Sequence, residues 1–451
     1  MKPIYIVSWL FALAVSFVSC DDWLDKTPKD RLYPDVYFKT EDELRLFTNQ
    51  FYNNLVPSAV DIYSESSDLI VKSDLMLEMS GQRIIPDEGN GWNFTALRDI
   101  NFYLQYSHNC TEVNARNRYD SVARFFRAYF YFEKVKRYGD IPWYDKALDS
   151  DDPELYKARD SREFVMQKML EDLDFAIANL PKTKNAYVLT RWTALALKSR
   201  VCLFEGTFRK YHGLEDCEKY LNACVSASET FMNESGYTLY KSGSTPYRDL
   251  FASINLQADE VIFGRDYEAS LSVLHNVQNY ENSTTMGRPG MNKKIVNSYL
   301  MADGSRFTDK AGYETMTFDQ ECQNRDPRLA QTIRTPGYTR IGSTKKEAPN
   351  LAYTMTGYHL IKYSMTANYD EYNKSCNDIP LFRTAEVYLN FAEAKAELGT
   401  LKQADINKSI KLLRDRVGMT NLDMELANSK PDPYLMSAAT GYPNVKGANQ
   451  G

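Results

Sequence analysis

Apolar residues recur along much of the chain at steps of three and four, the spacing of one face of an α-helix. In segment 161–180, Met166, Leu170 and Leu173 fall on one stripe, and Pro181 ends the pattern. Polar caps before such stripes and Gly or Pro after them mark the helix ends. The predicted helices span residues 42–55, 119–138, 161–180, 190–205, 215–232, 383–398 and 404–417.

All but the first of these helices follow one another as pairs, 119–138 with 161–180, 190–205 with 215–232, and 383–398 with 404–417. Small residues in "RWTALALKSR" and "LNFAEAKAEL" favour close helix packing. The pattern resembles tetratricopeptide units, in which helix pairs bury one face by stacking on neighbours, although no strict period repeats. We therefore expect a mostly α fold built on a scaffold of helical hairpins.

The amino-acid composition changes between residues 233 and 380, where Gly, Pro, Ser, Asn and Thr cluster. Short runs such as "EVIFGRDY" and "YHLIKYS" interrupt these clusters and predict short strands. The helical scaffold thus carries a large loop-rich insert, and long ordered loops are where binding residues concentrate.

The first residues form an apolar run, 4–18, behind the single charge of Lys2. The run is too short for a comfortable membrane span and has the flanks of a secretory signal. It ends at Cys20 in a pattern that resembles a bacterial lipobox, which predicts a signal peptide at 1–19 and a lipid on Cys20. The alternatives are a buried core helix and ordinary secretion without lipid. Asp21 and Asp22 resemble the surface-export signal of Bacteroidetes lipoproteins.

The composition of the chain restricts the classes of molecule that it can bind. The chain has 451 residues and a formal net charge of −6 without basic blocks, which disfavours nucleic acid. No later apolar run is long enough to span a membrane. The cysteines after Cys20 show no paired spacing, so we interpret them as small hydrophobic residues. The 32 tyrosines, with an apolar ring and a polar hydroxyl, suit partly hydrated surfaces and the contacts between helices.

The sequence contains no common catalytic motif, and its four histidines are far apart. The loop 149–154 has enough carboxylates for a structural Ca²⁺, but it lacks the EF-hand spacing and glycine, so we expect no cofactor. We expect the acidic run 171–174 to be solvated on its helix, and Arg127 to pair within the scaffold. A glycosidase needs two nearby carboxylates, and nothing in the sequence points to such a pair.

Several blocks together resemble the SusD/RagB family of outer-membrane nutrient-binding lipoproteins. In chain order they include "CDDWLDKTP", "WNFTALRDIN", "RFFRAYFYFEKVKRYGDIPW", "RWTALALKSRVCLFEGTF", "RDPRLAQTI" and "LFRTAEVYLNFAEAKAELG". The resemblance implies a cell-surface protein of the outer membrane, anchored through Cys20. It would capture a glycan and deliver it to a SusC-like TonB-dependent transporter, without being an enzyme.

The resemblance also implies where a glycan binds. Sugars lay C–H faces on aromatic rings and offer hydroxyls to planar polar groups. In the loop before "ALRDIN" the candidates are Asp74, Arg83, Trp92 and Asn93, with Trp92 expected on an exposed loop tip. In the insert they are Tyr267, Tyr280 and Arg288.

We therefore expect one SusD-like domain over 20–451 after the signal peptide. Its parts are a helical part 20–232, the insert 233–380, a helical hairpin 381–422 and a tail 423–451. Family members continue into a closing region rich in Arg and Glu that the tail does not resemble, so we expect either a truncated protein or a partial sequence. The alternative functions are a helical-repeat adaptor for proteins or peptides and, less favoured, a glycoside hydrolase.

Overall fold

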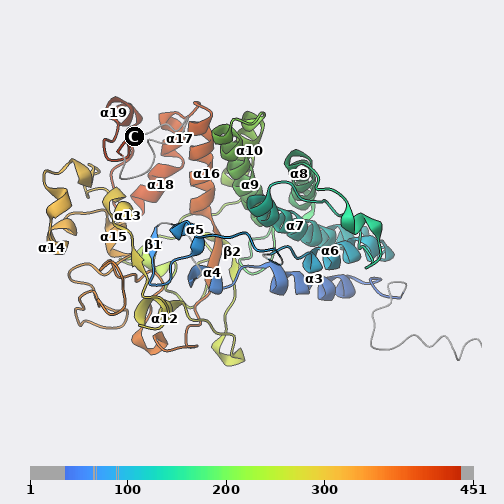
Figure 1. The fold of residues 1–451 in the computed structure, drawn as a ribbon, viewed down its shortest axis with the longest axis horizontal. Coiled ribbons are helices and arrows are strands. Elements are labelled where there is room, and N and C mark those ends of the chain that lie inside the picture. Colours follow the sequence, from blue (N-terminus) through green and yellow to red (C-terminus); the bar gives the residue numbers. More distant parts are fainter. Residues whose placement is uncertain (1–35, 64–66, 68, 88, 90, 438–451) are drawn as a thin grey trace, which may run out of the picture.

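The structure is a computed structural model that describes residues 36–63, 67, 69–87, 89 and 91–437. The predicted signal peptide and Cys20 lie outside these residues. Long helices occupy one end and the centre of an elongated molecule, and a loop-rich part occupies the other end (Figure 1). No helix within the described residues has the length and apolar character that crossing a membrane requires.

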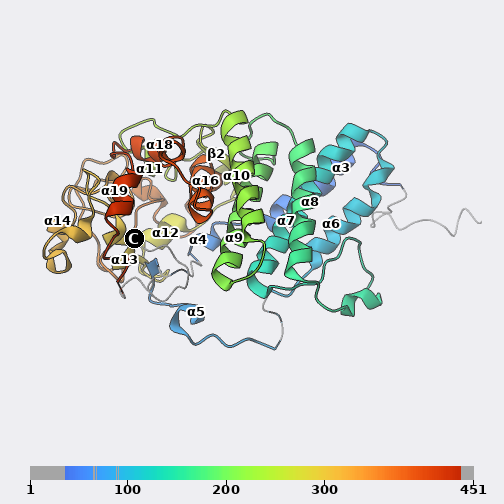
Figure 2. The ribbon, with the colours of Figure 1, turned by 90° about the horizontal axis from the view of Figure 1, so that it is seen from above.

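The long helices confirm the predicted mostly α class. They pack serially: α3 and α6 lie on α7, and α8, α9, α10 and α16 follow as successive neighbours (Figure 2). The predicted pairing of 119–138 with 161–180 appears as α7 with α8, and that of 190–205 with 215–232 as α9 with α10. Their bounds are α3 (Glu41–Leu55), α6 (Thr95–Tyr106), α7 (Val113–Tyr138), α8 (Arg162–Asn179), α9 (Arg191–His212), α10 (Cys217–Glu234) and α16 (Thr384–Glu397).

The remaining helices are short and most of them lie in the loop-rich part. The α-helices are α4 (Val60–Tyr63), α5 (Leu77–Ser80), α11 (Pro246–Asp249), α12 (Val277–Asn282), α13 (Lys293–Ser298), α14 (Phe318–Glu321), α15 (Pro327–Ala330), α17 (Gln403–Asn407), α18 (Ile410–Asp415) and α19 (Met424–Ser429). The 3₁₀ turns are η1 (Ser107–Asn109), η2 (Pro153–Tyr156), η3 (Ala269–Leu271), η4 (Phe307–Asp309), η5 (Tyr313–Thr315) and η6 (Ala367–Tyr369).

Two small antiparallel sheets tie distant segments together. Strand β1 (Ile70–Val71) pairs with β3 (Gly290–Met291), and β2 (Val261–Arg265) pairs with β4 (Ile379–Arg383) with a bulge. The strand predicted in "EVIFGRDY" is confirmed as β2. The strand predicted in "YHLIKYS" is wrong: His359 and Leu360 form only isolated bridges, because they pair with different segments at Gly290 and Ile333.

The main core is rich in aromatic rings from α3, α6 and α7. Tyr131 is fully buried, stacks on Trp143 at 4.3 Å between ring centroids, and its hydroxyl accepts the backbone N–H of Tyr144 at 2.6 Å. The same hydroxyl lies 3.2 Å from the carbonyl of Pro142. Buried tyrosines of this kind hold the turn after α7 through their hydroxyls, so part of the tyrosine content is structural.

One acidic residue of the run 171–174 departs from the expectation of solvation. Asp172 is buried and accepts two hydrogen bonds from the Arg127 guanidinium, at 2.7 and 2.8 Å. The Arg127 pairing expected from the sequence is therefore confirmed. The solvated interpretation is wrong for Asp172 because α7 packs against the face of α8 that carries it.

Helix α9 is longer than predicted. It passes through Gly206 and ends at Gly213, whose left-handed backbone (φ 67°) forms the C-cap. A Cβ atom on Gly206 would lie 2.7 Å from the Leu221 side chain. The glycine thus marks the close approach of α9 and α10 and does not end the helix.

The helix predicted at 404–417 is also wrong as a single element. It is divided into α17 and α18 at Ser409, whose backbone (φ −134°, ψ −88°) is not helical. The buried Ser409 hydroxyl donates to the Asp405 carbonyl at 2.6 Å. Serine side chains compete with the helix backbone in this way, and α16 packs on α18.

We expect Gly206→Ala to lower the free energy of unfolding by about 1–3 kcal/mol, since the added methyl overpacks the α9–α10 contact. Urea denaturation followed by circular dichroism measures the change. In a Leu221→Ala background the same substitution is expected to cost less, because the two closest atoms, both of the Leu221 side chain, are gone and only the backbone N of residue 221 stays at 3.1 Å. An equal cost in both backgrounds would show that the close approach is not its cause.

Candidate ligand-binding site

Asn93 lies in the turn that leads into α6. Its backbone N–H donates to the Gly91 carbonyl at 2.9 Å, and its side-chain oxygen accepts the N–H of Thr95 at 2.8 Å. Gly91 has a φ of 82°, which favours glycine, and its carbonyl also accepts the Lys134 ammonium from α7. The turn is therefore pinned to the helical scaffold at both the backbone and the side chain.

Trp92, next to it, is 39% exposed. Phe94 and Tyr138 meet it edge to face at 5.3 and 4.9 Å between centroids, and the Arg159 guanidinium lies 4.9 Å from its centroid. The ring borders a hollow of about 360 Å³ together with Tyr144. Trp92 thus shares its surface between packing and solvent and does not stand alone on a loop tip.

On the other side of the turn lies a larger, open depression of about 800 Å³, here called the α3–α7 groove. Its walls come from the end of α3, from α4, from the Asn93 turn, and from α6 and α7. The groove gathers amides and carboxylates beside aromatic rings, which together suit hydroxyl-rich ligands. The polar residues that define it are Asn53, Asn54, Asp61, Asn93, Asp99 and Glu133, and the rings are Tyr129 and Phe130.

Asp99 is the least satisfied carboxylate of the α3–α7 groove. It is half-buried, and burial raises its pKa above the usual range of an aspartate, an effect that the neighbouring Arg98 partly opposes. Within the described part of the chain no side chain or backbone N–H donates to it, whereas Asp61 accepts the N–H of Ser58 at 2.8 Å. A ligand hydroxyl in the groove would supply the donor that Asp99 lacks.

A second depression, of about 420 Å³ and here called the α12 hollow, adjoins the groove. The two share Pro57, Ser58 and Asp61 as a common wall. Tyr280 and Glu281 of α12 form part of the far side of the α12 hollow. The two depressions therefore follow one another along the surface, on either side of segment 57–61.

Glu281 is fully buried at the α12 hollow. Its carboxylate accepts the Ser364 hydroxyl at 2.7 Å and the N–H of Tyr363 at 3.1 Å. Burial nevertheless raises the pKa of Glu281 to about 7, because these hydrogen bonds do not offset the loss of water.

The raised pKa predicts a pH effect on stability. A carboxyl whose pKa is higher in the folded than in the unfolded protein stabilises most below the unfolded pKa and loses that contribution as the pH rises. The wild-type advantage over Glu281→Gln should therefore fall between about pH 4.5 and 7, by at most about 1.4 kcal/mol per pH unit. Denaturation series of both proteins check this, and a constant difference would contradict it. Taking the difference removes the opposite slopes of His275 and His359, whose pKa values burial lowers to about 4 and 3.

Three of the sequence candidates meet around segment 57–61. Asn93 lines the α3–α7 groove and Tyr280 lines the α12 hollow, although only 3% of Tyr280 is exposed. Tyr267 is buried, and its hydroxyl accepts the N–H of Ala59 at 2.8 Å. Tyr267 thus supports the shared wall from behind.

The other candidates lie elsewhere. Asp74 and Arg83 belong to the exposed segment around α5, which runs along the outside of the molecule, and neither borders the groove or the α12 hollow (Figure 2). Arg288 donates to the carbonyls of Leu351 and Ala352 at 2.9 and 2.8 Å, so its guanidinium holds a loop of the insert.

Sequence reasoning missed most of the polar residues of the groove. Asn53 and Asn54 end α3, Asp99 lies on α6 and Glu133 on α7, positions that read as ordinary helix surface. The adjacent asparagines before Pro57 were the one available signal, since amides at a helix end are typical of caps as well as of ligand sites.

The structure gives no support to a cation site in loop 149–154. Asp152 accepts the N–H of Glu154 at 2.9 Å, and the Lys146 ammonium lies 3.7 and 3.0 Å from these two carboxylates. Across the ranges described above, no group of three or more His, Cys, Asp or Glu side chains is placed to hold a metal ion.

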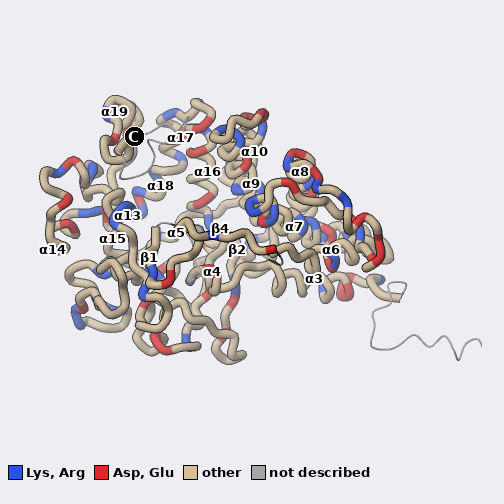
Figure 3. The backbone as a smooth tube through the Cα atoms, viewed as in Figure 1, with Lys and Arg blue, Asp and Glu red and all other residues tan. Residues whose placement is uncertain are grey.

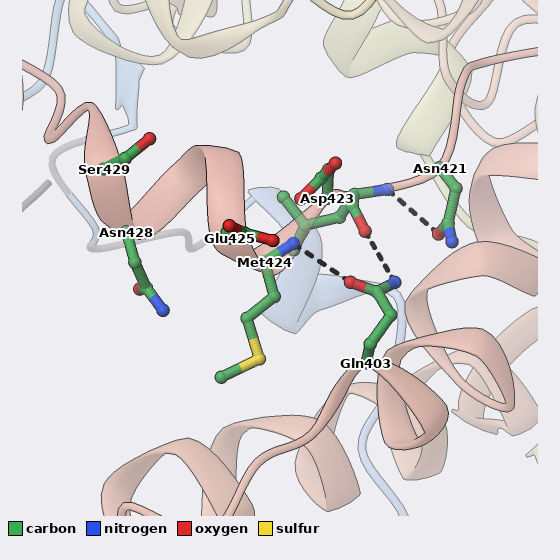
Figure 4. Close-up of a pocket in the computed structure, with 8 residues that line it drawn as sticks. Gln403, Asn421, Asp423, Met424, Glu425, Asn428 and Ser429 are labelled. Carbon is green, nitrogen blue, oxygen red and sulfur yellow. Dashed lines mark hydrogen bonds between the residues drawn. The ribbon is translucent and has the colours of Figure 1, made fainter.

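A further open hollow, of about 1080 Å³, lies by α17 and α19 (Figure 4). Gln403 spans its edge, donating to the Leu422 carbonyl at 2.9 Å and accepting the N–H of Met424 at 3.0 Å. None of the described residues that line it is aromatic, and it lies far from α6 along the molecule (Figure 1). We therefore place the candidate site at the α3–α7 groove.

Basic and acidic residues are interspersed along the backbone (Figure 3). The groove itself combines Asp61, Asp99 and Glu133 with Lys134 and Arg265. Mixed charge of this kind fits a neutral, hydroxyl-rich ligand better than a polyanion such as nucleic acid.

A serial stack of helix pairs with a loop-rich part and an open polar groove defines a binding protein on a tetratricopeptide-like scaffold. Two family models match the chain: one of the SusD family over residues 250–441, and one described as "Starch-binding associating with outer membrane" over residues 82–191. The chain belongs to the SusD/RagB family.

Relatives and solved structures agree with this assignment. SusD-like protein P2 of Formosa agariphila is 25% identical over 445 residues, covering 92% of this chain and 82% of that protein. A SusD-like protein of Bacteroides fragilis superposes with a TM-score of 0.68 at 21% identity, covering 88% of this chain and 83% of the other. A SusD-like carbohydrate-binding protein of the same species has a TM-score of 0.70 at 18% identity, covering 85% and 80%. These structures share the fold.

Proposed function

We propose that this chain is a cell-surface lipoprotein that captures an oligosaccharide or polysaccharide and delivers it to a SusC-like TonB-dependent transporter of the outer membrane. Cys20 carries the lipid anchor in this proposal, and no catalytic step is involved. The support comes from membership of the SusD/RagB family and from the carbohydrate-binding relative of the same fold.

The observation that carries the proposal is the half-buried Asp99 carboxylate, which has no donor among the described residues and is set among amides in an open groove. Sugar hydroxyls are donors as well as acceptors, so a glycan matches both kinds of group at once. Tyr129, which is partly exposed, adds ring surface for sugar C–H groups, while Phe130 is buried. Trp92 remains a proposed stacking residue at the rim, with the exposed part of its ring.

The experiment is a calorimetric titration of the soluble form with a panel of oligosaccharides. We expect Asp99→Asn to weaken binding of the best ligand about tenfold, since a hydrogen bond to a charged group contributes about 1.5–3 kcal/mol. Asp42→Asn is the matched control, an exposed aspartate on α3 that pairs with Arg45 outside the groove. Equal affinities for Asp99→Asn and wild type would remove the groove from the proposal.

The same samples separate capture from catalysis and from protein binding. Incubation with the bound glycan should release no new reducing ends, whereas a glycosidase would release them. Co-purification of a TonB-dependent transporter with the chain from outer membranes tests delivery. A helical-repeat adaptor would instead bind none of the sugars.

A further inference from the structure

A separate hollow of about 480 Å³ lies in the loop-rich part and shares no lining residue with the α12 hollow. Arg334 and Arg340 belong to its wall, and Lys345 lies at its exposed edge. Asn282, the last residue of α12, accepts a hydrogen bond from Arg334 at 2.8 Å. We call this space the Arg340 hollow, and it shares no residue with the α3–α7 groove.

Arg340 is only 5% exposed and lacks acceptors for part of its guanidinium. One terminal nitrogen, Nη2, pairs with Asp370, but Nε and Nη1 are buried without a hydrogen-bond partner in the described part of the chain. The Arg334 guanidinium, equally buried, pairs with Glu347 at 3.1 Å and also leaves its Nε without an acceptor. Leaving the donors of a buried guanidinium without acceptors costs free energy. An acceptor that binds here therefore gains more binding free energy than one that binds an exposed arginine.

The charges at the hollow do not cancel. Arg334, Arg340 and Lys345 face two carboxylates, Glu347 and Asp370, which leaves one positive charge in excess. Burial lowers the pKa of Arg334, and the neighbouring charge of Arg340 lowers it further. An anion between the two guanidiniums would relieve both effects.

The rest of the wall suits a sugar ring. Tyr353, Pro349 and Leu351 offer ring and apolar surface beside the cations. Arg288 fixes this wall, because it binds the carbonyls of Leu351 and Ala352. One wall of the Arg340 hollow is thus apolar and held in place, and another carries guanidiniums that lack some of their hydrogen-bond acceptors.

We propose that the Arg340 hollow binds the acidic group, carboxylate or sulfate, of a charged sugar unit. Arg340 and Arg334 hold the anion from the buried side, Lys345 from the open side, and Tyr353 lies against the ring. The chain would then prefer acidic glycans, with the α3–α7 groove taking their hydroxyl-rich stretches. This preference rests on the proposed function, whereas anion binding in the hollow does not.

The test compares three tetrasaccharides by calorimetry: a neutral one, one of uronic acids and one carrying sulfate esters. Inorganic sulfate and a uronic acid monosaccharide serve as small probes. We expect at least one acidic tetrasaccharide to bind more tightly than the neutral one, with an affinity that falls as NaCl rises. The arm that responds identifies carboxylate or sulfate as the recognised group.

Lys345→Gln and Lys346→Gln form a matched pair of exposed neighbours, of which only Lys345 borders the hollow. Lys345→Gln should lower the affinity for acidic ligands about threefold to fivefold, as expected for the loss of an exposed ion pair. Lys346→Gln should leave this affinity unchanged. Arg340→Lys keeps the charge beside Asp370 but loses the planar fork, and should weaken acidic ligands about tenfold. A thermal melt confirms that each variant is folded.

Equal binding of acidic and neutral ligands, with no difference between the two lysine variants, would overturn the proposal. If neutral glycans still bind in an Asp99-dependent manner in that case, the proposed function stands. Lys345-dependent binding of sulfate or the uronic acid, with no oligosaccharide binding in the groove, would support the Arg340 hollow and contradict the proposed function.

Discussion

Replacing Asp172 with alanine is expected to lower the free energy of unfolding by about 3–5 kcal/mol, as breaking a buried ion pair does. Asp172 is only 2% exposed, and the Arg127 guanidinium donates to both of its oxygens. Without the carboxylate, Arg127 keeps one weaker hydrogen bond, to Asn101 at 3.3 Å, and remains buried between α7 and α8. Urea denaturation at neutral pH measures the loss.

Asp174, two residues along the same helix, is the matched control. It pairs with Lys198, but its side chain is 58% exposed. Asp174→Ala should therefore cost less than about 1 kcal/mol. Similar losses for the two variants would show that burial of the Arg127–Asp172 pair is not what makes it important.

The second large effect is expected at Glu260, directly before β2. Its carboxylate is fully buried and accepts from Arg383 at 2.9 Å, from Arg416 at 2.8 Å and from the N–H of Tyr240 at 2.9 Å. Glu260→Ala leaves the guanidinium of Arg416 buried without its carboxylate, so we expect a loss of about 3–5 kcal/mol in the free energy of unfolding. The bonds connect β2 to the C-terminal helices, and the variant should also expose α18 to hydrogen exchange.

Glu229→Ala provides the comparison for Glu260. Glu229 pairs with Lys408 at 3.2 Å, with 40% and 47% of the two side chains exposed. This pair also connects segments far apart in the chain, yet its loss should cost less than about 1 kcal/mol. A larger cost at Glu229 than at Glu260 would contradict the role assigned to burial.

The helical scaffold could be predicted because its signals are local. Thr40, Ser161 and Thr190 cap α3, α8 and α9 as expected of such residues before an apolar stripe. Gly206 misled the prediction, since a glycine that ends a helix and one that admits a neighbouring side chain look alike in a sequence. Only the position of Leu221 on the next helix distinguishes them.

The candidate site could be predicted only in part. The family block "WNFTALRDIN" predicts Asn93, which does line the groove. Asp99 and Asp172 both lie on helices and look equally solvated in the sequence, yet one lines a groove and the other pairs within the core. The packing of α7 against two different helices decides this, and no local pattern reports it.

The loop-rich part was the least predictable. The sequence predicts Tyr280 and Arg288 as ligand contacts in loops, but Tyr280 is buried in α12 and Arg288 binds backbone carbonyls. The guanidiniums of Arg334 and Arg340 are positioned by long-range contacts with Asn282 and Asp370. Contacts between segments so far apart in the chain depend on the whole fold.

The central claim is that the α3–α7 groove binds a glycan. A crystal structure of the soluble protein with the best oligosaccharide of the panel tests it most directly. We predict sugar density along Asn53, Asp61 and Asn93, with a hydroxyl within hydrogen-bonding distance of the Asp99 carboxylate. Density only at another surface, or an empty groove at a saturating ligand concentration, would contradict the account.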